Sequence, residues 1–317
     1  MLQLGAQLEA EGYRVHYTSS QPRQVLRMLD MLWTVIKCRR QTDVVLLDTY
    51  GTLNFYYAVL VGVLCRVLRL PYIPILHGGT LPERLEKSPR KSALVFKHAK
   101  LLVSPSLYLM EAFKQYGYHN LRFIPNTIAI DNYPMVPKRY ESIRLLWVRS
   151  FSKIYNPCMA VYLLKQLQNQ GHKATLTMVG PDSDGSLKTV KALAAKLKVK
   201  INFTGKLCKP EWIALAKEHN IFINTTNFDN MPVSVIEAMA LGLPVVSTKV
   251  GGMPYLIEDG VDGVLVPLND VSAMAEAILR LQSNADLANA IAVRARVKAE
   301  GFDWSVVRKQ WLEFLSF

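Results

Sequence analysis

Two carboxylates stand eight positions apart in the stretch DNMPVSVIEAMALG, which covers residues 229–242. Pro232 lies between Asp229 and Glu237, and proline is favoured at the first position of a helix because its fixed φ angle suits the helix. The first turn of a helix has free N–H groups and the positive end of the helix dipole, which together bind anions. The stretch therefore predicts a loop acid, an anion site and a helix acid in close succession.

The anion site is expected at the edge of a sheet. The run NIFINT, residues 220–225, is typical of a buried strand. Parallel sheets of α/β proteins bind ligands outside the carboxyl ends of their strands, where this helix begins. We expect the N–H groups of Val233, Ser234 and Val235 to hold a diphosphate there.

The two acids have a sugar-binding and a structural interpretation. Asp229 can accept hydrogen bonds from sugar hydroxyls, and Glu237, on the second helical turn, can accept two from a ribose diol. Alternatively, Asp229 or Asn230 is an N-cap and Glu237 is solvated, as in many surface helices. Both interpretations stay open at this point.

Two cations follow another predicted strand on a single loop. Arg149 and Lys153 come directly after the run IRLLWV, residues 143–148, and can hold a leaving diphosphate as it gains negative charge. The alternative is ordinary surface charge. Further along, Gly251 and Gly252 permit positive φ angles and close backbone approach.

The triplet Asp182-Ser183-Asp184 imitates the Asp-x-Asp pattern of some metal sites. It follows Gly-Pro in a polar loop, and a divalent cation requires more carboxylates than this triplet supplies. We expect a turn here and no metal site.

Short β-rich runs alternate twice with helical patterns along the chain. Strands are predicted in the first half over residues 13–19, 43–48, 72–76, 99–105 and 121–125, and in the second over 143–148, 174–180, 200–205, 220–225, 243–248 and 263–267. Two rounds of alternation predict two doubly wound parallel sheets, joined by the loop 125–142. Beyond Val271 the tail is helical, and Trp304, Val307, Trp311 and Leu315 fall near helical spacing.

The net charge of +13 is concentrated in the first half, where residues 1–140 carry 18 Lys and Arg against 9 Asp and Glu. An anionic partner is indicated, and no nucleic-acid recognition motif accompanies the charge. The segment 23–40 mixes Leu, Met, Trp and Ile with Arg and Lys, so it can lie on a membrane surface. The alternative is a helix that covers a sheet. Arg84, Lys87, Arg90 and Lys91 can contact an anionic acceptor or a lipid head group, or be solvated charge.

The four cysteines stand singly, which argues against a zinc site or a disulfide framework and fits a reducing compartment. The longest apolar run, residues 54–65, is too short to span a membrane.

The second half, about residues 141–317, resembles glycosyltransferase family four, the "group 1" glycosyl transferases. The resemblance rests on WVRSFSK, MVGPDSDG, INFTGK, FINTTNFDNMPVSVIEAMALGLPVVSTKVGG, DGVLVP and FDWSVV. It implies the GT-B fold: α/β, with two facing Rossmann-like domains. We expect an N-terminal acceptor domain over 1–135, a donor domain over 136–300, and a C-terminal helix over 301–317 that packs back towards the first domain.

The resemblance also implies residue roles. In the family, two glutamates separated by seven residues contact the donor sugar and the ribose; the matching residues here are Asp229, one methylene shorter, and Glu237. Arg149 and Lys153 match the phosphate-binding cations. Gly180 matches a glycine near the donor, and the base is expected near the backbone of Lys206 and Leu207. Donor contacts are also expected from Asn230, Met231, Pro232, Val233 and Ser234.

In the first half, His77 follows the predicted strand 72–76. The resemblance implies that it contacts the donor sugar or positions the acceptor; the alternative is a hydrogen-bonded histidine at a strand end. The family usually begins with an earlier strand and a glycine-rich turn. The first domain is therefore expected to lack its first strand, and we hypothesise that the natural chain starts upstream of Met1 or that this chain is truncated.

The implied activity is that of a retaining glycosyltransferase, which moves a sugar from a nucleotide-diphosphate sugar to a saccharide or lipid-linked acceptor. No metal or other cofactor is expected. Bacterial surface polysaccharide synthesis in the cytoplasm, with contact to an anionic membrane face, fits the basic first half. The alternative is a non-catalytic homologue that binds sugar nucleotides.

Overall fold

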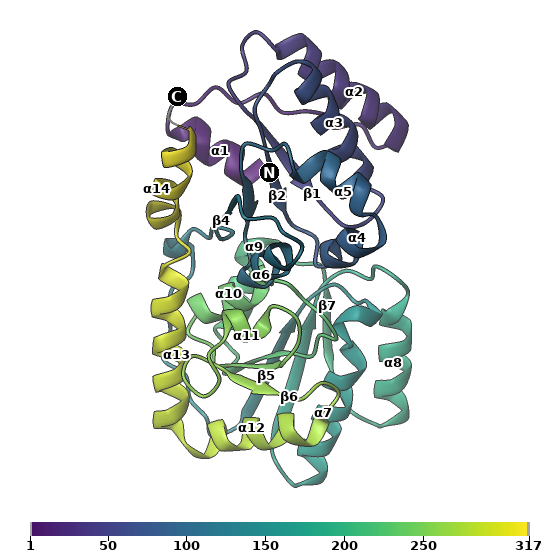
Figure 1. The fold of residues 1–317 in the computed structure, drawn as a ribbon. Helices are drawn as coiled ribbons and strands as arrows, with labels where there is room; N and C mark the ends of the chain where they lie inside the picture. The colour runs from purple at the N-terminus through teal and green to yellow at the C-terminus, as the bar shows by residue number, and fades with distance from the viewer. Residues whose placement is uncertain (1, 316–317) are drawn as a thin grey trace. The chain divides into compact units, whose positions relative to one another are not determined.

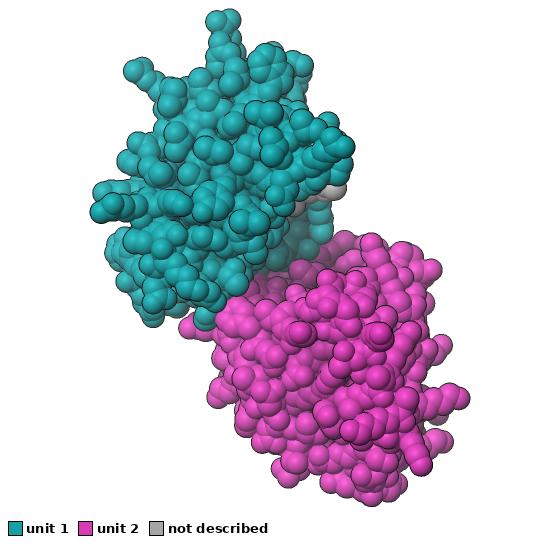
Figure 2. Space-filling model, turned by 90° about the vertical axis from the view of Figure 1, so that its right-hand side faces the viewer, with its two compact units in different colours: residues 1–127, 304–317 teal, residues 128–303 magenta. Residues whose placement is uncertain are grey.

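The computed structural model describes residues 2–315, so Met1, whose status as the native start is an open question, lies outside them. The chain divides into two compact units, coloured separately in Figure 2. Unit 1 consists of residues 1–127 and 304–317, and unit 2 of residues 128–303.

Unit 1 contains a four-stranded parallel sheet in the order β1-β2-β3-β4. The strands are β1 (Val45–Thr49), β2 (Tyr72–Leu76), β3 (Leu102–Ser104) and β4 (Leu121–Phe123). All five residues of β2 are buried, as expected for a strand covered on both faces.

The strand predicted over residues 13–19 is wrong, because this segment has no regular secondary structure. Its apolar residues Tyr13 and Val15 pack against the core of unit 1 without pairing to a neighbouring strand. In the described sheet, β1 pairs only with β2. The alternating pattern therefore reflects the partial burial of Tyr13 and Val15, and the backbone ladder that defines a strand is not formed.

Helices cover both faces of this sheet (Figure 1). The helices of unit 1 are α1 (Leu2–Ala10), α2 (Gln24–Cys38), α3 (Phe55–Val67), α4 (Leu81–Lys87), α5 (Pro89–Phe96), α6 (Leu107–Gln115) and α14 (Trp304–Leu315). One core contains side chains of α2, α3 and α5, and the core on the other face contains side chains of α1 and α14. Val307, Trp311 and Leu315 are buried, as their spacing predicts.

Unit 2 contains a six-stranded parallel sheet in the order β10-β9-β8-β5-β6-β7. The strands are β5 (Ile143–Val148), β6 (Ala174–Val179), β7 (Asn202–Gly205), β8 (Ile221–Asn224), β9 (Val245–Thr248) and β10 (Val264–Val266). All six strands predicted for the second half are confirmed. The strand order reverses between β5 and β8, whose registers pair Leu145 with Ile221. In doubly wound sheets this reversal marks the ligand crevice.

Unit 2 is completed by helices on both sheet faces. They are α7 (Pro157–Asn169), α8 (Ser186–Lys196), α9 (Lys209–Ala216), α10 (Val233–Ala240), α11 (Met253–Leu256), α12 (Val271–Ser283) and α13 (Ala285–Glu300), with the short 3-10 turns η1 (Ile130–Asn132) and η2 (Lys153–Tyr155). Ile128 and Tyr133, which precede the expected domain boundary at residue 135, are buried in the core of unit 2.

No helix between residues 2 and 315 combines the length and apolar character needed to cross a membrane.

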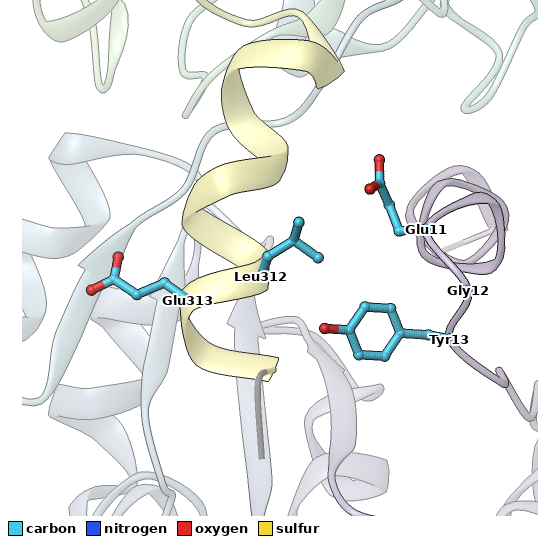
Figure 3. Close-up of a pocket in the computed structure, with 5 residues that line it drawn as sticks. All are labelled: Glu11, Gly12, Tyr13, Leu312 and Glu313. Atoms are coloured by element: carbon cyan, nitrogen blue, oxygen red, sulfur yellow. The ribbon is translucent and has the colours of Figure 1, made fainter.

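A hollow of about 530 Å³ lies in unit 1 (Figure 3). It is lined by Glu11, Gly12, Tyr13, Leu312 and Glu313. The carboxylate of Glu11 accepts a hydrogen bond from Trp304 Nε1 at 3.1 Å and pairs with Arg308 at 3.3 Å. No residue selected in the sequence lines this hollow, and we assign no part of the candidate site to it.

Candidate functional site

Arg149 and Asp229 meet at the reversal of the strand order in unit 2. Arg149 directly follows β5, and Asp229 lies in the loop after β8. Their side chains form an ion pair and are only 17% and 14% exposed. The guanidinium also lies over the ring of Tyr155, 4.4 Å from its centroid, and burial lowers the pKa of Arg149. Two residues predicted separately from the sequence therefore form one buried charged pair.

The loop that carries Asp229 is packed against the two glycines that follow β9. The N–H of Gly252 donates to the carbonyl oxygen of Asp229 at 2.8 Å. A Cβ atom on Gly251 would lie 2.2 Å from that oxygen, and one on Gly252 would lie 1.7 Å from the carbonyl oxygen of Asn230. Close backbone approach was expected of these glycines, and the structure identifies the 229–230 loop as the segment approached.

Gly180 also permits close approach of two backbone segments, here its own loop and the backbone of Arg149. Its φ angle is +148°, and a Cβ there would lie 1.8 Å from the carbonyl oxygen of Arg149. Its N–H donates to the carbonyl of Gly205 at 2.8 Å. The loops after β5, β6 and β7 are thus drawn together by a residue that must be glycine.

The helix α10 begins at Val233, one residue later than predicted. Pro232 precedes the helix, because its ψ angle of 120° is extended. The carbonyl of Pro232 accepts the N–H of Val235 at 3.1 Å, so one of the three N–H groups expected to be free is bonded. The N–H groups of Val233 and Ser234 have no hydrogen-bond partner among the described residues.

Two side-chain atoms beside this helix start are also unpaired. Ser234 Oγ and Asn230 Oδ1 are buried and accept or donate no hydrogen bond within the described residues. Neither Asp229 nor Asn230 caps the helix, so the N-cap interpretation is wrong. Asp229 Oδ1 instead accepts the N–H of Asn230 at 2.8 Å. Buried polar groups normally have partners, so this concentration of unpaired groups is typical of a ligand site.

Glu237 is buried, which rules out the solvated alternative. Its side chain is 5% exposed, and Oε1 accepts the hydroxyl of Tyr133 at 2.7 Å and pairs with the ammonium of Lys209. Oε2 accepts no hydrogen bond from the described residues. Burial, together with the Glu237 carboxylate, raises the pKa of Tyr133.

Tyr133 and Lys209 were not selected from the sequence. Lys209 opens α9 shortly after β7, so its place beyond a strand end was the available signal. Tyr133 lies in the loop before β5 and has no such signal, because only the tertiary fold brings it to Glu237.

The remaining donor-site candidates are exposed or only partly buried. Lys153 lies in η2, and its exposed ammonium forms no ion pair within residues 2–315. Lys206, after β7, is exposed. Leu207 and Met231 are partly buried against the same core cluster of unit 2.

The Asp182-Ser183-Asp184 triplet forms a bend that leads into α8. Asp182 Oδ1 accepts the N–H of Gly185 at 2.9 Å. Asp184 accepts the hydroxyl and N–H of Ser186, and its Oδ2 accepts the N–H of Lys153 at 2.9 Å. These hydrogen bonds, that of the Ser186 hydroxyl above all, lower the pKa of Asp184 to about 2.

His77 lies in unit 1, at the carboxyl end of β2. Its Nε2 is 2.7 Å from Asp48 Oδ1, and its ring stacks on Tyr50 with centroids 5.6 Å apart. Asp48 was not selected from the sequence, although its position near the end of β1, beside β2, was a usable signal. The structure therefore supplies the hydrogen-bonded histidine of the alternative interpretation and a carboxylate that orients its ring.

Comparison with known proteins identifies related sequences. Residues 143–284 match the family model described as "Glycosyl transferases group 1". The chain is 28% identical over 265 residues to the amylovoran biosynthesis glycosyltransferase AmsK of Erwinia amylovora, covering 79% of this chain and 65% of AmsK. It is 37% identical over 91 residues to the putative colanic acid biosynthesis glycosyltransferase WcaL of Escherichia coli, covering 28% and 22%. The chain spans under two-thirds of the length of either relative.

Solved structures share the fold. HepE of Anabaena, in complex with UDP and glucose, has a TM-score of 0.80 at 21% identity and covers 98% of this chain and 88% of its own. Sucrose-phosphate synthase of Thermosynechococcus elongatus has a TM-score of 0.82 at 16% identity, covering 98% and 90%. The predicted fold class, α/β with the GT-B architecture, and the resemblance stated above are confirmed.

Proposed function

We propose that this protein, whose residues 143–284 match the family model of the group 1 glycosyl transferases, transfers a sugar from a nucleotide-diphosphate sugar to an acceptor hydroxyl, with retention of configuration. The observation that carries the proposal is the Arg149–Asp229 ion pair at the reversal of strand order, beside the unpaired start of α10. The names of AmsK and WcaL, and the UDP bound to HepE, support it.

In the proposed site, the diphosphate lies at the amino end of α10. The N–H groups of Val233 and Ser234, the Ser234 hydroxyl and the helix dipole bind the phosphate oxygens. Lys153, whose ammonium forms no ion pair with any described residue, closes on the outer phosphate. Negative charge grows on the leaving phosphate as the glycosidic bond breaks, and these groups stabilise it in the transition state.

Glu237 binds the ribose in this proposal. Tyr133 and Lys209 hold Oε1, which keeps the carboxylate in place and leaves Oε2 for a ribose hydroxyl. The base lies along the backbone of Lys206 and Leu207. Gly180 keeps the loops around it close together.

Asp229 and Arg149 act as a pair. The carboxylate of Asp229 accepts hydrogen bonds from the donor sugar, while the guanidinium of Arg149 has further N–H groups for a phosphate oxygen. The cations and the helix dipole balance the phosphate charge, so we propose that no metal ion takes part. Asn230, Met231 and Pro232 complete the wall of the donor site.

The acceptor is proposed to be a saccharide or a lipid-linked saccharide of bacterial surface polysaccharide synthesis, with His77 positioning the acceptor or the sugar. The proposed location is the cytoplasm, in contact with the inner membrane face. Nucleic acid is not a proposed partner.

A non-catalytic sugar-nucleotide-binding protein is the second candidate. It is favoured by Asp229, which is shorter than glutamate and already neutralised by Arg149. The experiment incubates the protein with a panel of sugar nucleotides and measures both binding and slow release of the nucleoside diphosphate. Release that Asp229→Asn abolishes supports the transferase. Binding without release, across a range of acceptors, supports the second candidate, and no binding to any donor contradicts both.

A further inference from the structure

Three helices of unit 1, α2, α3 and α5, form one layer over the sheet (Figure 1). Their inward residues, including Val35, Phe55 and Val95, share one core with Leu47 and Tyr72 of the strands. The interpretation of the segment 23–40 as a helix that covers a sheet is therefore confirmed. The outward side of this helix layer takes no part in that packing.

The outward side is also apolar. On α2, Val25, Leu29 and Trp33 repeat every four residues and are 72%, 58% and 64% exposed. Residues at this spacing lie on one face of a helix. The neighbouring α3 exposes Leu60 and Val67 to 45% and 73%. We call these five residues, with the 45% exposed Leu26, the outer apolar face. Exposed apolar side chains gathered on two helices that pack against each other are typical of an interaction site.

The same layer is strongly basic. The segments 23–40, 55–69 and 89–97 contain ten arginines and lysines and a single acid, Asp30. Arg23, Lys37, Arg39 and Arg40 are exposed at the two ends of α2. An apolar stripe with a tryptophan, bordered by cations, is the pattern of a helix that lies in the plane of an anionic bilayer surface.

We propose that unit 1 binds the surface of an anionic phospholipid membrane through the outer apolar face, without crossing it. Trp33, Leu29 and Val25 enter the boundary between head groups and acyl chains, and the flanking cations pair with lipid phosphates. The proposal deepens the membrane contact in the proposed function by naming the lipid-binding residues, and its physical basis does not depend on the donor site in unit 2.

The test uses the full chain and vesicles of phosphatidylcholine with about one-third phosphatidylglycerol, against phosphatidylcholine alone. We expect co-sedimentation with the anionic vesicles only. The double variant Leu29→Ser/Trp33→Ser should weaken binding at least about tenfold, because it removes the two largest inserted side chains. The matched control, Val293→Ser/Val297→Ser, alters residues of α13 that are 50% and 63% exposed and should bind as the wild type does.

Trp33 also reports its own insertion. Trp147, Trp212 and Trp311 are buried and Trp304 is half-buried, so Trp33 is the most exposed tryptophan. Anionic vesicles should shift its emission to shorter wavelength, and brominated lipid should quench it. Trp33→Phe should keep most of the binding and lose the spectral shift.

Other outcomes overturn the proposal. Absence of binding to anionic vesicles does so directly. Binding that survives Leu29→Ser/Trp33→Ser but is lost in Arg39→Glu/Arg40→Glu indicates attraction to charge without insertion. Self-association that the Leu29→Ser/Trp33→Ser variant abolishes assigns the face to a second copy of the chain. Sugar-nucleotide binding, measured separately on each variant, should stay unchanged, which separates this test from that of the proposed transfer.

Discussion

Arg149 pairs with Asp229 across the point where the strand order of unit 2 reverses. Both side chains are largely shielded from water, so each neutralises a charge that would be costly to bury alone. Loss of either partner would therefore leave an unpaired buried charge in unit 2 and also disturb the proposed contact with the donor.

Removing one member of this pair should be costly. Asp229→Ala leaves a buried guanidinium without its carboxylate, and we expect the free energy of unfolding to fall by about 3 kcal/mol, measured by urea denaturation. The control is Glu83→Gln, which breaks the exposed Lys87–Glu83 pair, whose side chains are 71% and 63% exposed. That change should cost under about 0.5 kcal/mol. Equal losses in the free energy of unfolding of the two variants would show that the burial of the Arg149–Asp229 pair does not raise the cost of breaking it.

Gly252 should not accept a side chain. In Gly252→Ala the new Cβ would overlap the carbonyl oxygen of Asn230, so the 229–230 loop must move. We expect a loss of about 2 kcal/mol in stability and weaker donor binding. Gly62→Ala is the control, because its Cβ would meet Tyr72 at 3.5 Å inside a helix, where alanine is favoured by about 0.5–1 kcal/mol. A tolerated Gly252→Ala with unchanged donor affinity would refute the close packing of the two loops.

The Tyr133 hydroxyl should affect both stability and donor binding through its hydrogen bond to Glu237. Tyr133→Phe removes the donor to a buried carboxylate and should cost about 1–2 kcal/mol of stability. If Glu237 binds ribose, the variant should raise KM for the donor more than it lowers kcat. Tyr140→Phe is a matched control, because the Tyr140 hydroxyl is buried without a hydrogen-bond partner among residues 2–315 and its removal should be neutral. A shift in kcat alone would argue against ribose binding.

The titration of Lys138 should make the stability of the protein increase with pH in the alkaline range. Burial lowers its pKa from 10.5 to about 8, and its ammonium donates to the carbonyl of Ala216 at 3.0 Å. The unfolded chain therefore holds the proton more tightly than the folded protein. This difference in pKa lowers the free energy of unfolding. The loss is fully present below pH 8 and disappears as the pH rises from about 8 to 10.5.

Lys138→Met removes this titration. We expect the wild type to gain stability relative to Lys138→Met between those two pH values, measured by urea denaturation of both proteins at each pH. Taking the difference between the two proteins cancels the contributions of tyrosines that titrate in the same range. A difference that stays constant with pH would show that Lys138 is not perturbed.

The sequence was most informative where one physical signal is enough. Strands such as β5 and β6 are buried on both faces, so they form apolar runs that can be recognised without knowing their neighbours. The rule that ligands lie beyond strand ends then placed Arg149 and Asp229 on the same edge.

Features that arise from tertiary contacts were not predicted. Glu237 has two partners from distant segments, Tyr133 and Lys209. Tyr133 carries no local pattern, and the only signal for Lys209 was its place beyond the end of β7. Segment 13–19 shows the opposite error: Tyr13 and Val15 are partly buried, as in an alternating strand, but the segment pairs with no strand among the described residues.

Helix α14 has a consequence for any attempt to divide this protein. It follows α13 of unit 2 along the chain, yet its side chains Val307, Trp311 and Leu315 belong to the core of unit 1. The polypeptide therefore passes between the units at residues 127–128 and again at 303–304, and the two passages are tied by the hydrogen bond from Ile128 N–H to the Phe302 carbonyl. A single cut cannot yield both halves intact. A recombinant first half needs the last helix supplied as a separate peptide, whereas residues 128–303 form one continuous piece for expression.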